Sequence, residues 1–238
     1  MNIAVISTML VMFLGCFTQS LTGFGVALVA MAVLPSLLGL HIATPLVALI
    51  AITLEAMMLI RYHASLKFKS ILGLLIPSLL AIPLGVVYFR RVDESVALFI
   101  LGLIIMLYAI YALIGFRLPN LEHPAWAWMF GFVGGLLGGA YNTSGPPAVI
   151  YANCRRWTPD EFKSRLSGYF IFGSAVVVST HWVSGNFTAE VISNYLISLP
   201  ALVLGFFLGQ KMDRWLNPEL FRRIVLVMLV VLGARLMV

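Results

Sequence analysis

Small polar residues interrupt an otherwise apolar sequence at two places, and they are the side chains best suited to binding chemistry. Hydroxyl and amide groups donate hydrogen bonds, and glycine lets a ligand approach the backbone closely. Helices that start at such breaks would direct their positive dipole ends towards the same place. Donors combined with positive dipoles predict an anion-binding site. Its candidate residues are Gln19, Thr22, Gly23 and Gly25 at the first break, and Asn142, Thr143, Ser144 and Gly145 at the second.

The alternative interpretation is that these small residues only allow helices to pack closely. The two breaks occupy matching positions, because Thr22-Gly23-Phe24-Gly25 aligns with Ser144-Gly145-Pro146-Pro147 at an offset of 122 residues. Close packing alone gives no reason for that correspondence, so the binding site is the favoured interpretation.

Two ionisable residues are candidates for carrying a proton. Glu55 is the carboxylate well inside an apolar stretch. Burying it ionised in lipid costs roughly 3 kcal/mol, so it is expected to face the protein interior or to be protonated. Structural pairing with Arg61 is the alternative, although a six-residue spacing suits helical contact poorly. His181 is the second candidate, but beside Trp182 it also fits an interfacial aromatic belt.

The composition is that of a polytopic membrane protein. The 238 residues are 61% apolar and 10% charged, with a mean hydropathy of +1.03, whereas soluble domains carry about 25% charged residues. The net charge of +6 comes from short basic clusters between apolar stretches, which excludes a nucleic-acid-binding surface. Cys16 and Cys154 lack any metal-ligand spacing, so neither a metal nor a cofactor is expected.

The apolar stretches predict membrane-spanning helices, each of which needs about 20 residues. Residues 2–39 and 124–154 are too long for one simple span, and each contains one of the breaks. The other stretches are roughly 42–60, 70–89, 95–116, 166–189, 191–210 and 220–238. Each broken segment is therefore followed by three ordinary spans, which predicts two membrane repeats, residues 1–118 and 119–238, in one all-α domain. Repeats that begin with broken segments are typical of secondary transporters.

The basic residues indicate how the repeats are oriented. If each broken segment crossed the membrane once, the two sides would hold 10 and 5 of the 15 Lys and Arg residues. If each is a hairpin that returns to the same side, the split is 12 to 3, with only Arg90, Arg91 and Arg235 on the poorer side. The richer side, which holds among others Arg117 and Arg214, is then cytoplasmic. The hairpin arrangement is favoured, and it predicts inverted repeats with both termini outside the cytoplasm.

The sequence also resembles the TauE/SafE sulfite exporter family over essentially its whole length. The resemblance is carried by Gly23-Phe24-Gly25, and by Gly134-Gly135-Leu136-Leu137-Gly138-Gly139 leading to Ser144-Gly145-Pro146-Pro147. It implies export of sulfite or of small organosulfonate and carboxylate anions across the bacterial inner membrane. Arg165 matches a basic position that the family often has, and it is expected to attract the substrate if it reaches the breaks; otherwise it is a snorkelling anchor. Tyr141-Asn142-Thr143 departs from the family's usual small or apolar residues.

These features predict a secondary transporter of small anions rather than an enzyme. The substrate is expected between the two breaks, in an alternating-access cycle to which Glu55 or His181 couples a proton. The expected partners are the anion, the lipid bilayer and that proton, and the oligomeric state is open between a monomer and a homodimer. A passive anion channel would use the same residues. An intramembrane serine hydrolase with a Ser144–His181 dyad is the third alternative, but it leaves the first break unexplained.

Overall fold

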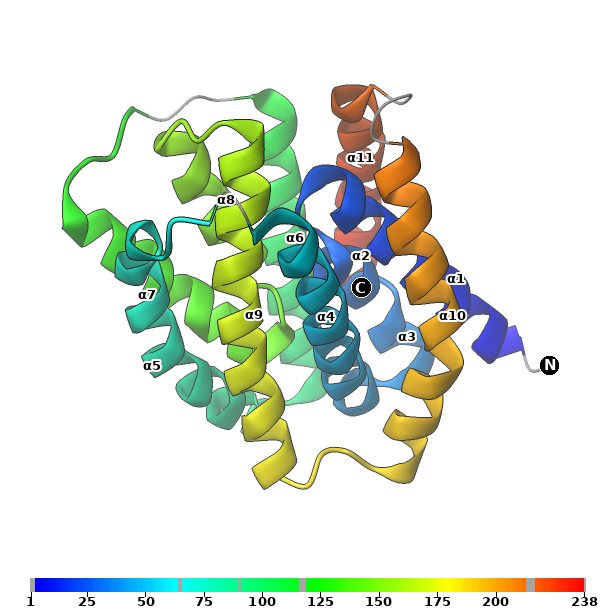
Figure 1. Ribbon diagram of the computed structural model, residues 1–238. Helices are drawn as coiled ribbons and strands as arrows, with labels where there is room; N and C mark the ends of the chain where they lie inside the picture. The colour runs from blue at the N-terminus through cyan, green and yellow to red at the C-terminus, as the bar shows by residue number, and fades with distance from the viewer. Residues whose placement is uncertain (1–2, 64–65, 90, 116–118, 213–216, 238) are drawn as a thin grey trace. The chain divides into compact units, whose positions relative to one another are not determined.

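Every regular element in the described part of the chain is a helix (Figure 1). The computed structural model describes residues 3–63, 66–89, 91–115, 119–212 and 217–237. Its helices are α1 (Ile3–Thr22), α2 (Val26–Met31), α3 (Leu34–Leu38), α4 (Leu40–Tyr62), the 3-10 helix η2 (Phe68–Ser70), α5 (Leu72–Phe89), α6 (Glu94–Ile114), α7 (Pro124–Tyr141), α8 (Gly145–Cys154), α9 (Pro159–Val183), α10 (Ala189–Met212) and α11 (Pro218–Leu236). The predicted all-α class is confirmed.

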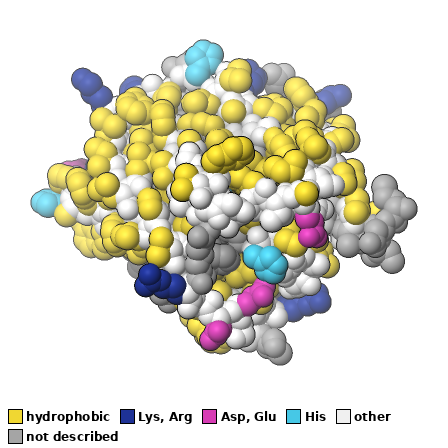
Figure 2. Space-filling model, turned by 90° about the horizontal axis from the view of Figure 1, so that it is seen from below, with side chains coloured by type: hydrophobic (Ala, Val, Ile, Leu, Met, Phe, Trp, Pro, Cys, Tyr) yellow, Lys and Arg dark blue, Asp and Glu magenta, His cyan; other side chains and the backbone are white. Residues whose placement is uncertain are grey.

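Five of these helices are long and apolar enough to cross a membrane: Val5–Thr22, Leu40–Tyr62, Glu94–Ile114, Pro159–Val183 and Ala189–Met212. Large apolar side chains such as Leu10, Leu107 and Leu204 are more than half exposed. Apolar side chains spread over much of the face shown in Figure 2, with few charges among them. Exposure on this scale suits lipid rather than water, so the chain is a multi-pass membrane protein.

The chain divides into two compact units. Unit 1 comprises Met1–Ile50, Val92–Phe116 and Gly185–Val238, and unit 2 comprises Ala51–Arg91 and Arg117–Ser184. Unit 1 therefore holds the first break and unit 2 the second. Each unit contains helices from both predicted repeats. The predicted boundary between the repeats lies between residues 118 and 119, and residue 118 is outside the described residues.

Both broken segments are hairpins. In unit 2, Phe130 contacts Tyr151 with 6.1 Å between ring centroids, and a Cβ atom at Gly138 would lie 3.2 Å from the Cβ of Ser144. Because residue numbers rise on one arm as they fall on the other, α8 runs back along α7. In unit 1, the N–H of Val26 donates to Oε1 of Gln19 at 3.0 Å, so α2 turns back along α1. The long kinked span is thereby excluded, and the return of each hairpin to its own side of the membrane stays a prediction.

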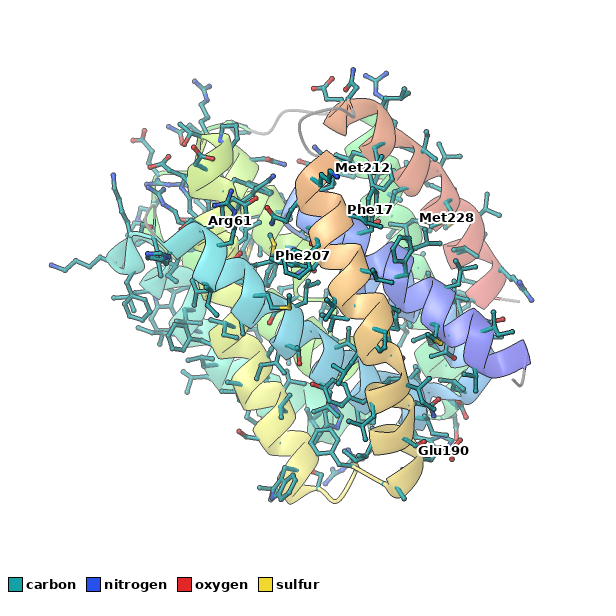
Figure 3. The ribbon with its side chains drawn as sticks, turned by 45° about the vertical axis from the view of Figure 1, so that its right-hand side comes forward. Phe17, Arg61, Glu190, Phe207, Met212 and Met228 are labelled. Carbon is teal, nitrogen blue, oxygen red and sulfur yellow. The ribbon has the colours of Figure 1, made fainter. Side chains whose placement is uncertain are left out.

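Glycines bring helices of the two predicted repeats together within each unit. In unit 2, a Cβ at Gly139 of α7 would lie only 2.1 Å from the carbonyl oxygen of Ile82 on α5. In unit 1, a Cβ at Gly205 of α10 would lie 2.7 Å from the carbonyl oxygen of Phe13 on α1. The contact of α1 (blue) with α10 (orange) is visible in Figures 1 and 3. Each repeat thus lends its third segment, α5 or α10, to the hairpin of the other. This reciprocity is expected of a duplicated chain, and the inverted orientation of the repeats stays a prediction.

Most predicted helix boundaries lie within a few residues of the observed ones, but those of α9 were wrong. The prediction was 166–189, and the helix is Pro159–Val183. Thr158 caps it, in a capping box with Glu161, and this cap adds a first turn whose charged residues conceal the apolar pattern. At the other end, Gly185 has a φ of 68° and the helix has already ended. Of the charges behind the predicted orientation, Arg90, Arg117 and Arg214 lie outside the described residues.

Candidate functional site

The first break is held by side chains that satisfy its own backbone. The hydroxyl oxygen of Thr22 lies 2.8 Å from the carbonyl oxygen of Thr18 and 2.7 Å from that of Phe24, so its single proton is shared between them. Gln19 accepts the first N–H of α2. Gly23 and Gly25 have φ angles of 90° and 119°, a region that favours glycine. These residues therefore shape the break, and much of their hydrogen-bonding capacity is used within it.

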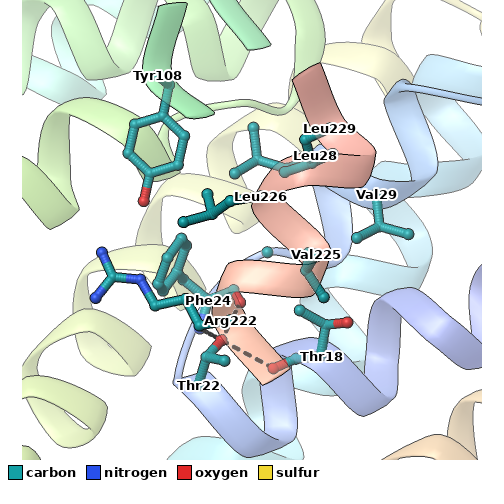
Figure 4. A pocket seen from close by; sticks show the side chains of 11 residues that line it. Thr18, Thr22, Phe24, Leu28, Val29, Tyr108, Arg222, Val225, Leu226 and Leu229 are labelled. Carbon is teal, nitrogen blue, oxygen red and sulfur yellow. Dashed lines mark hydrogen bonds between the residues drawn. The ribbon is translucent and has the colours of Figure 1, made fainter. Parts of the chain in front are cut away.

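A pocket opens beside this break (Figure 4). Its lining comes from the hairpin, from α6 and from α11, all within unit 1. Most of the side chains are apolar, and the polar ones are hydroxyls and one guanidinium. The lining residues are Thr18, Thr22, Phe24, Gly25, Leu28, Val29, Tyr108, Arg222, Val225, Leu226 and Leu229.

Arg222 gives the pocket a positive charge. Its guanidinium faces the hydroxyl of Tyr108, and its Nε atom has no hydrogen-bond partner within the described residues. Across those same residues it forms no ion pair with a carboxylate. A half-buried guanidinium without a counter-charge attracts an anion strongly, because charges interact more strongly where water is scarce. The pocket thus joins one cation to an apolar wall.

The second break, in unit 2, differs in its donors. Asn142 adopts a left-handed conformation with a φ of 56°, and its N–H donates to the carbonyl oxygen of Gly138 at 2.9 Å. Oγ1 of Thr143 donates to the carbonyl oxygen of Leu137 at 3.4 Å. Ser144 is half-buried, and its hydroxyl makes no hydrogen bond within the described part of the chain. Ser144 is therefore an available donor at this break.

The start of α8 offers few backbone donors. Its first residue is Gly145, and the next two, Pro146 and Pro147, have no N–H group. At the first break, the initial N–H of the six-residue α2 is already bound by Gln19. The helix ends at the two breaks are thus not open rows of N–H groups, and a ligand at either break would have to be bound mostly by side chains.

Arg165 lies at the start of α9, where its charge is compensated. Nη2 forms an ion pair with Glu161, and the guanidinium lies 4.9 Å from the ring centroid of Trp157. Only 8% of its side chain is exposed. No hydrogen bond or ion pair joins it to the second break among the described residues, so this geometry fits a residue that fixes the start of α9.

Glu55 is buried in unit 2, as the sequence predicts. It is 5% exposed, and it lies against the hydroxyl of Ser174 on α9. Its Oε2 atom has no hydrogen-bond partner in the described residues, and Arg61 forms no ion pair with it there. Glu55 is therefore not the structural half of a Glu55–Arg61 pair.

Comparison with known proteins decides the family. Residues 8–236 match the model of the family described as sulfite exporter TauE/SafE. The chain belongs to this family.

Two curated proteins with transport names are similar to the chain. The probable sulfite/organosulfonate exporter TauE of Cupriavidus necator is 25% identical over 229 residues, which cover 94% of this chain and 90% of that protein. The probable inner membrane transporter protein TsaS of Comamonas testosteroni is 23% identical over 189 residues, which cover 73% of this chain and 76% of that protein. No solved structure matches the chain significantly.

Membership of a TauE/SafE transporter family agrees with the geometry around Ser144 and His181. A serine hydrolase needs its histidine base within hydrogen-bond reach of the serine. The Ser144 hydroxyl makes no hydrogen bond to His181 among the described residues, and His181 is buried beside the 74%-exposed Trp182. The contact that would activate the serine is not formed.

Sequence reasoning missed Arg222 and Tyr108. Arg222 was counted among the loop charges because it opens an apolar stretch beside Arg223, and Tyr108 lies in the middle of a span without any motif around it. The position of Arg222, four residues after Pro218 at the start of α11, could have indicated it. A charge that only anchors a helix end is expected in the first turn, and Arg222 lies beyond that turn.

Proposed function

We propose that this TauE/SafE family member is a secondary transporter that exports small organic anions across the bacterial inner membrane. The observation that carries the proposal is the pocket at the first break, where Arg222 supplies a positive charge without a carboxylate partner in the described residues. An anion bound there would complete the charge balance that the protein leaves open.

The pocket's lining supports one kind of anion in particular. Leu28, Val29 and Leu226 form part of its apolar wall, while Arg222 and the Tyr108 hydroxyl offer a polar end. Such a division suits a sulfonate or carboxylate that carries a small apolar group better than a bare oxyanion, because the wall offers a bare oxyanion no hydrogen bonds. The relative from Cupriavidus necator is named for both sulfite and organosulfonate.

The second break is proposed to take part in the same transport. The Ser144 hydroxyl makes no capping hydrogen bond to α8, and Asn142 and Gly145 are half-buried beside it. In an alternating-access cycle, substrate contacts form and break as the protein opens to one side at a time. Two compact units with one break each provide bodies that such a cycle requires.

Glu55 is the proposed coupling group. An acid buried in a membrane helix is stable when neutral, and it releases a proton when its surroundings become aqueous. Ser174 offers a hydrogen bond that either protonation state can use. Transport would then couple anion movement to a proton gradient.

The deciding experiment combines binding and flux on the purified protein. Sulfite, thiosulfate, nitrate, acetate-like acids and alkyl or aryl sulfonates are tested for binding by calorimetry, and the ligands that bind are then followed in proteoliposomes with and without a pH gradient. We expect sulfonates with an apolar group to bind more tightly than sulfite, and a pH gradient to drive them uphill.

Two outcomes would contradict the proposal. Flux that only follows the anion's own gradient would identify a passive channel. Unchanged anion binding in both Ser144→Ala and Asn142→Ala would remove the second break from the site. Insertion of these variants is checked by their yield and elution in detergent.

A further inference from the structure

A second basic region, separate from both breaks, lies at one end of unit 2. It comprises the end of α4, the 3-10 helix η2 and the start of α9. Its cations are Arg61, Lys67, Lys69, Lys163 and Arg165, and we call it the α4–α9 basic cluster. The transport proposal uses none of its exposed lysines.

Aromatic rings hold the cluster together. Nζ of Lys163 lies 5.5 Å from the ring centroid of Tyr62, and the guanidinium of Arg61 lies 6.0 Å from the same ring. Two elements far apart in sequence thus bring positive charges to one tyrosine. Such contacts stabilise each cation without neutralising it.

The acidic residues of the cluster compensate three of its cations, Arg61, Lys67 and Lys69, only weakly or not at all. Glu161 serves both Arg165 and Lys67, and its contact with Lys67 is long, at 3.9 Å. The Lys67 side chain is 73% exposed. Arg61 and Lys69 form no ion pair within the described residues. Glu161, already engaged by Arg165, therefore compensates little of the charge that Arg61, Lys67 and Lys69 bring to the cluster.

The surroundings of the cluster are those of a membrane surface. α4 and α9 are both long and apolar enough to span a membrane, and the cluster lies where the first ends and the second begins. Phe68 is 43% exposed and stacks edge-on against Phe172 of α9, with 5.4 Å between centroids. An exposed aromatic ring next to cations matches the headgroup level, where rings enter the acyl boundary and lysines remain in water.

From these features we infer that the α4–α9 basic cluster binds the headgroup of an anionic phospholipid. The phosphate oxygens would lie among Arg61, Lys67 and Lys163, and the acyl chains would run along Phe68 and the apolar face of α9. Clusters of four to eight basic residues next to a spanning helix attract anionic lipids. A soluble phosphate would gain nothing from Phe68, so the lipid is the occupant that uses both parts of the surface.

The test measures lipid binding to the purified full chain by native mass spectrometry, in detergent mixed with phosphatidylglycerol or with phosphatidylcholine. The triple variant Arg61→Gln/Lys67→Gln/Lys163→Gln is compared with a control, Arg91→Gln/Lys211→Gln/Arg235→Gln, which removes three exposed cations elsewhere. We expect the cluster variant to lose phosphatidylglycerol affinity by at least roughly tenfold, since each surface cation contributes on the order of 1 kcal/mol. The control should retain most of it.

Several results would overturn the assignment. These are equal loss in both triple variants, no preference of the wild type for phosphatidylglycerol, or displacement of the lipid by soluble glycerol phosphate at a similar concentration. Tighter binding of an acidic peptide than of the lipid would identify a protein partner instead. If the triple variant fails to fold, the single exposed change Lys67→Gln and the added change Phe68→Ser give the same comparison.

Discussion

Arg222 is costly to hold where it lies. A guanidinium loses hydration when apolar side chains surround it. Neighbours such as Leu226 and Leu229 offer no hydrogen bond in place of the lost water. Tyr108 offers an oxygen but no charge. A site that only needed stability would be better served by an apolar residue, so the charge at this position supports the proposed anionic ligand.

Neutralising Arg222 should therefore weaken anion binding selectively. In Arg222→Gln, a charge-assisted hydrogen bond worth about 1.5–3 kcal/mol is lost, which corresponds to a roughly 10- to 100-fold weaker affinity. The control is Arg223→Gln, since Arg223 is exposed and lines no part of the pocket. Calorimetric titration with a sulfonate measures both. Equal effects in the two variants would mean that the charge acts at long range and not in the pocket.

Replacing Glu55 should leave anion transport intact but remove its coupling to the proton gradient. Glu55→Gln keeps the size and the hydrogen bond to Ser174 but cannot exchange a proton, so uphill flux driven by a pH gradient should vanish while anion exchange persists. Glu190→Gln is the matched control, because Glu190 is an exposed carboxylate at the start of α10. A Glu55→Gln protein that is still driven by the pH gradient would make Glu55 a structural residue. Flux is recorded in proteoliposomes with an internal pH dye.

At the scale of helices, glycines decide which elements can approach each other. Gly131, Gly135 and Gly139 recur every four residues on one face of α7, and a Cβ at any of them would lie within 2.3 Å of a carbonyl oxygen of α5. Gly134 and Gly138 lie on another face, towards Tyr169 and Ser144. One face of α7 thus packs closely against the backbone of α5, and another face packs against Ser144 at the second break.

Adding a methyl group to this contact should separate the helices. In Gly139→Ala the new Cβ would meet the backbone of Ile82, which has no rotamer to change, so we expect a loss of about 1–3 kcal/mol of stability. Gly173→Ala is the control, because its Cβ would lie 3.7 Å from the flexible end of Ile82. Thermal unfolding in detergent compares them. A Gly139→Ala protein as stable as the control would show that α5 and α7 can shift apart without cost.

The sequence predicted these elements more fully than it predicted the site. Glycine and proline mark the breaks directly, so Thr22 to Gly25 and Asn142 to Pro147 could be located and read as interruptions. The wall of the pocket could not be found in this way, because Tyr108 and Leu226 are ordinary apolar-span residues until the fold brings α6 and α11 to the hairpin. Gln19 has a role that the sequence did not reveal, since its side chain accepts the first N–H of α2, while its part in substrate binding stays a prediction.

At the scale of the whole chain, the two predicted repeats depend on each other. α1 of the first repeat packs against α10 of the second, and α7 of the second packs against α5 of the first. Both compact units are consequently assembled from both repeats. Neither repeat on its own contains the partner of its hairpin.

Expressing the chain as two polypeptides tests this dependence. Residues 1–118 and 119–238 produced separately should each be degraded or aggregate, since the glycine faces of α7 and α10 would lack their partners. Produced together, they should co-purify and bind a sulfonate. A single repeat that is stable alone, with an elution volume of a compact monomer, would contradict the expectation.

The same reciprocity has a consequence for how the protein is made. While a ribosome is still translating the second repeat, α1 has already entered the membrane without α10, and α5 without α7. The Gly85 side of α5 and the Phe13 side of α1 are then left facing lipid or the insertion machinery. α7 emerges first and covers α5, whereas α1 must wait for α10, and unit 1 is complete only when α11, the last helix, has been made. The α1 face thus stays without its partner for longer during synthesis than the α5 face does.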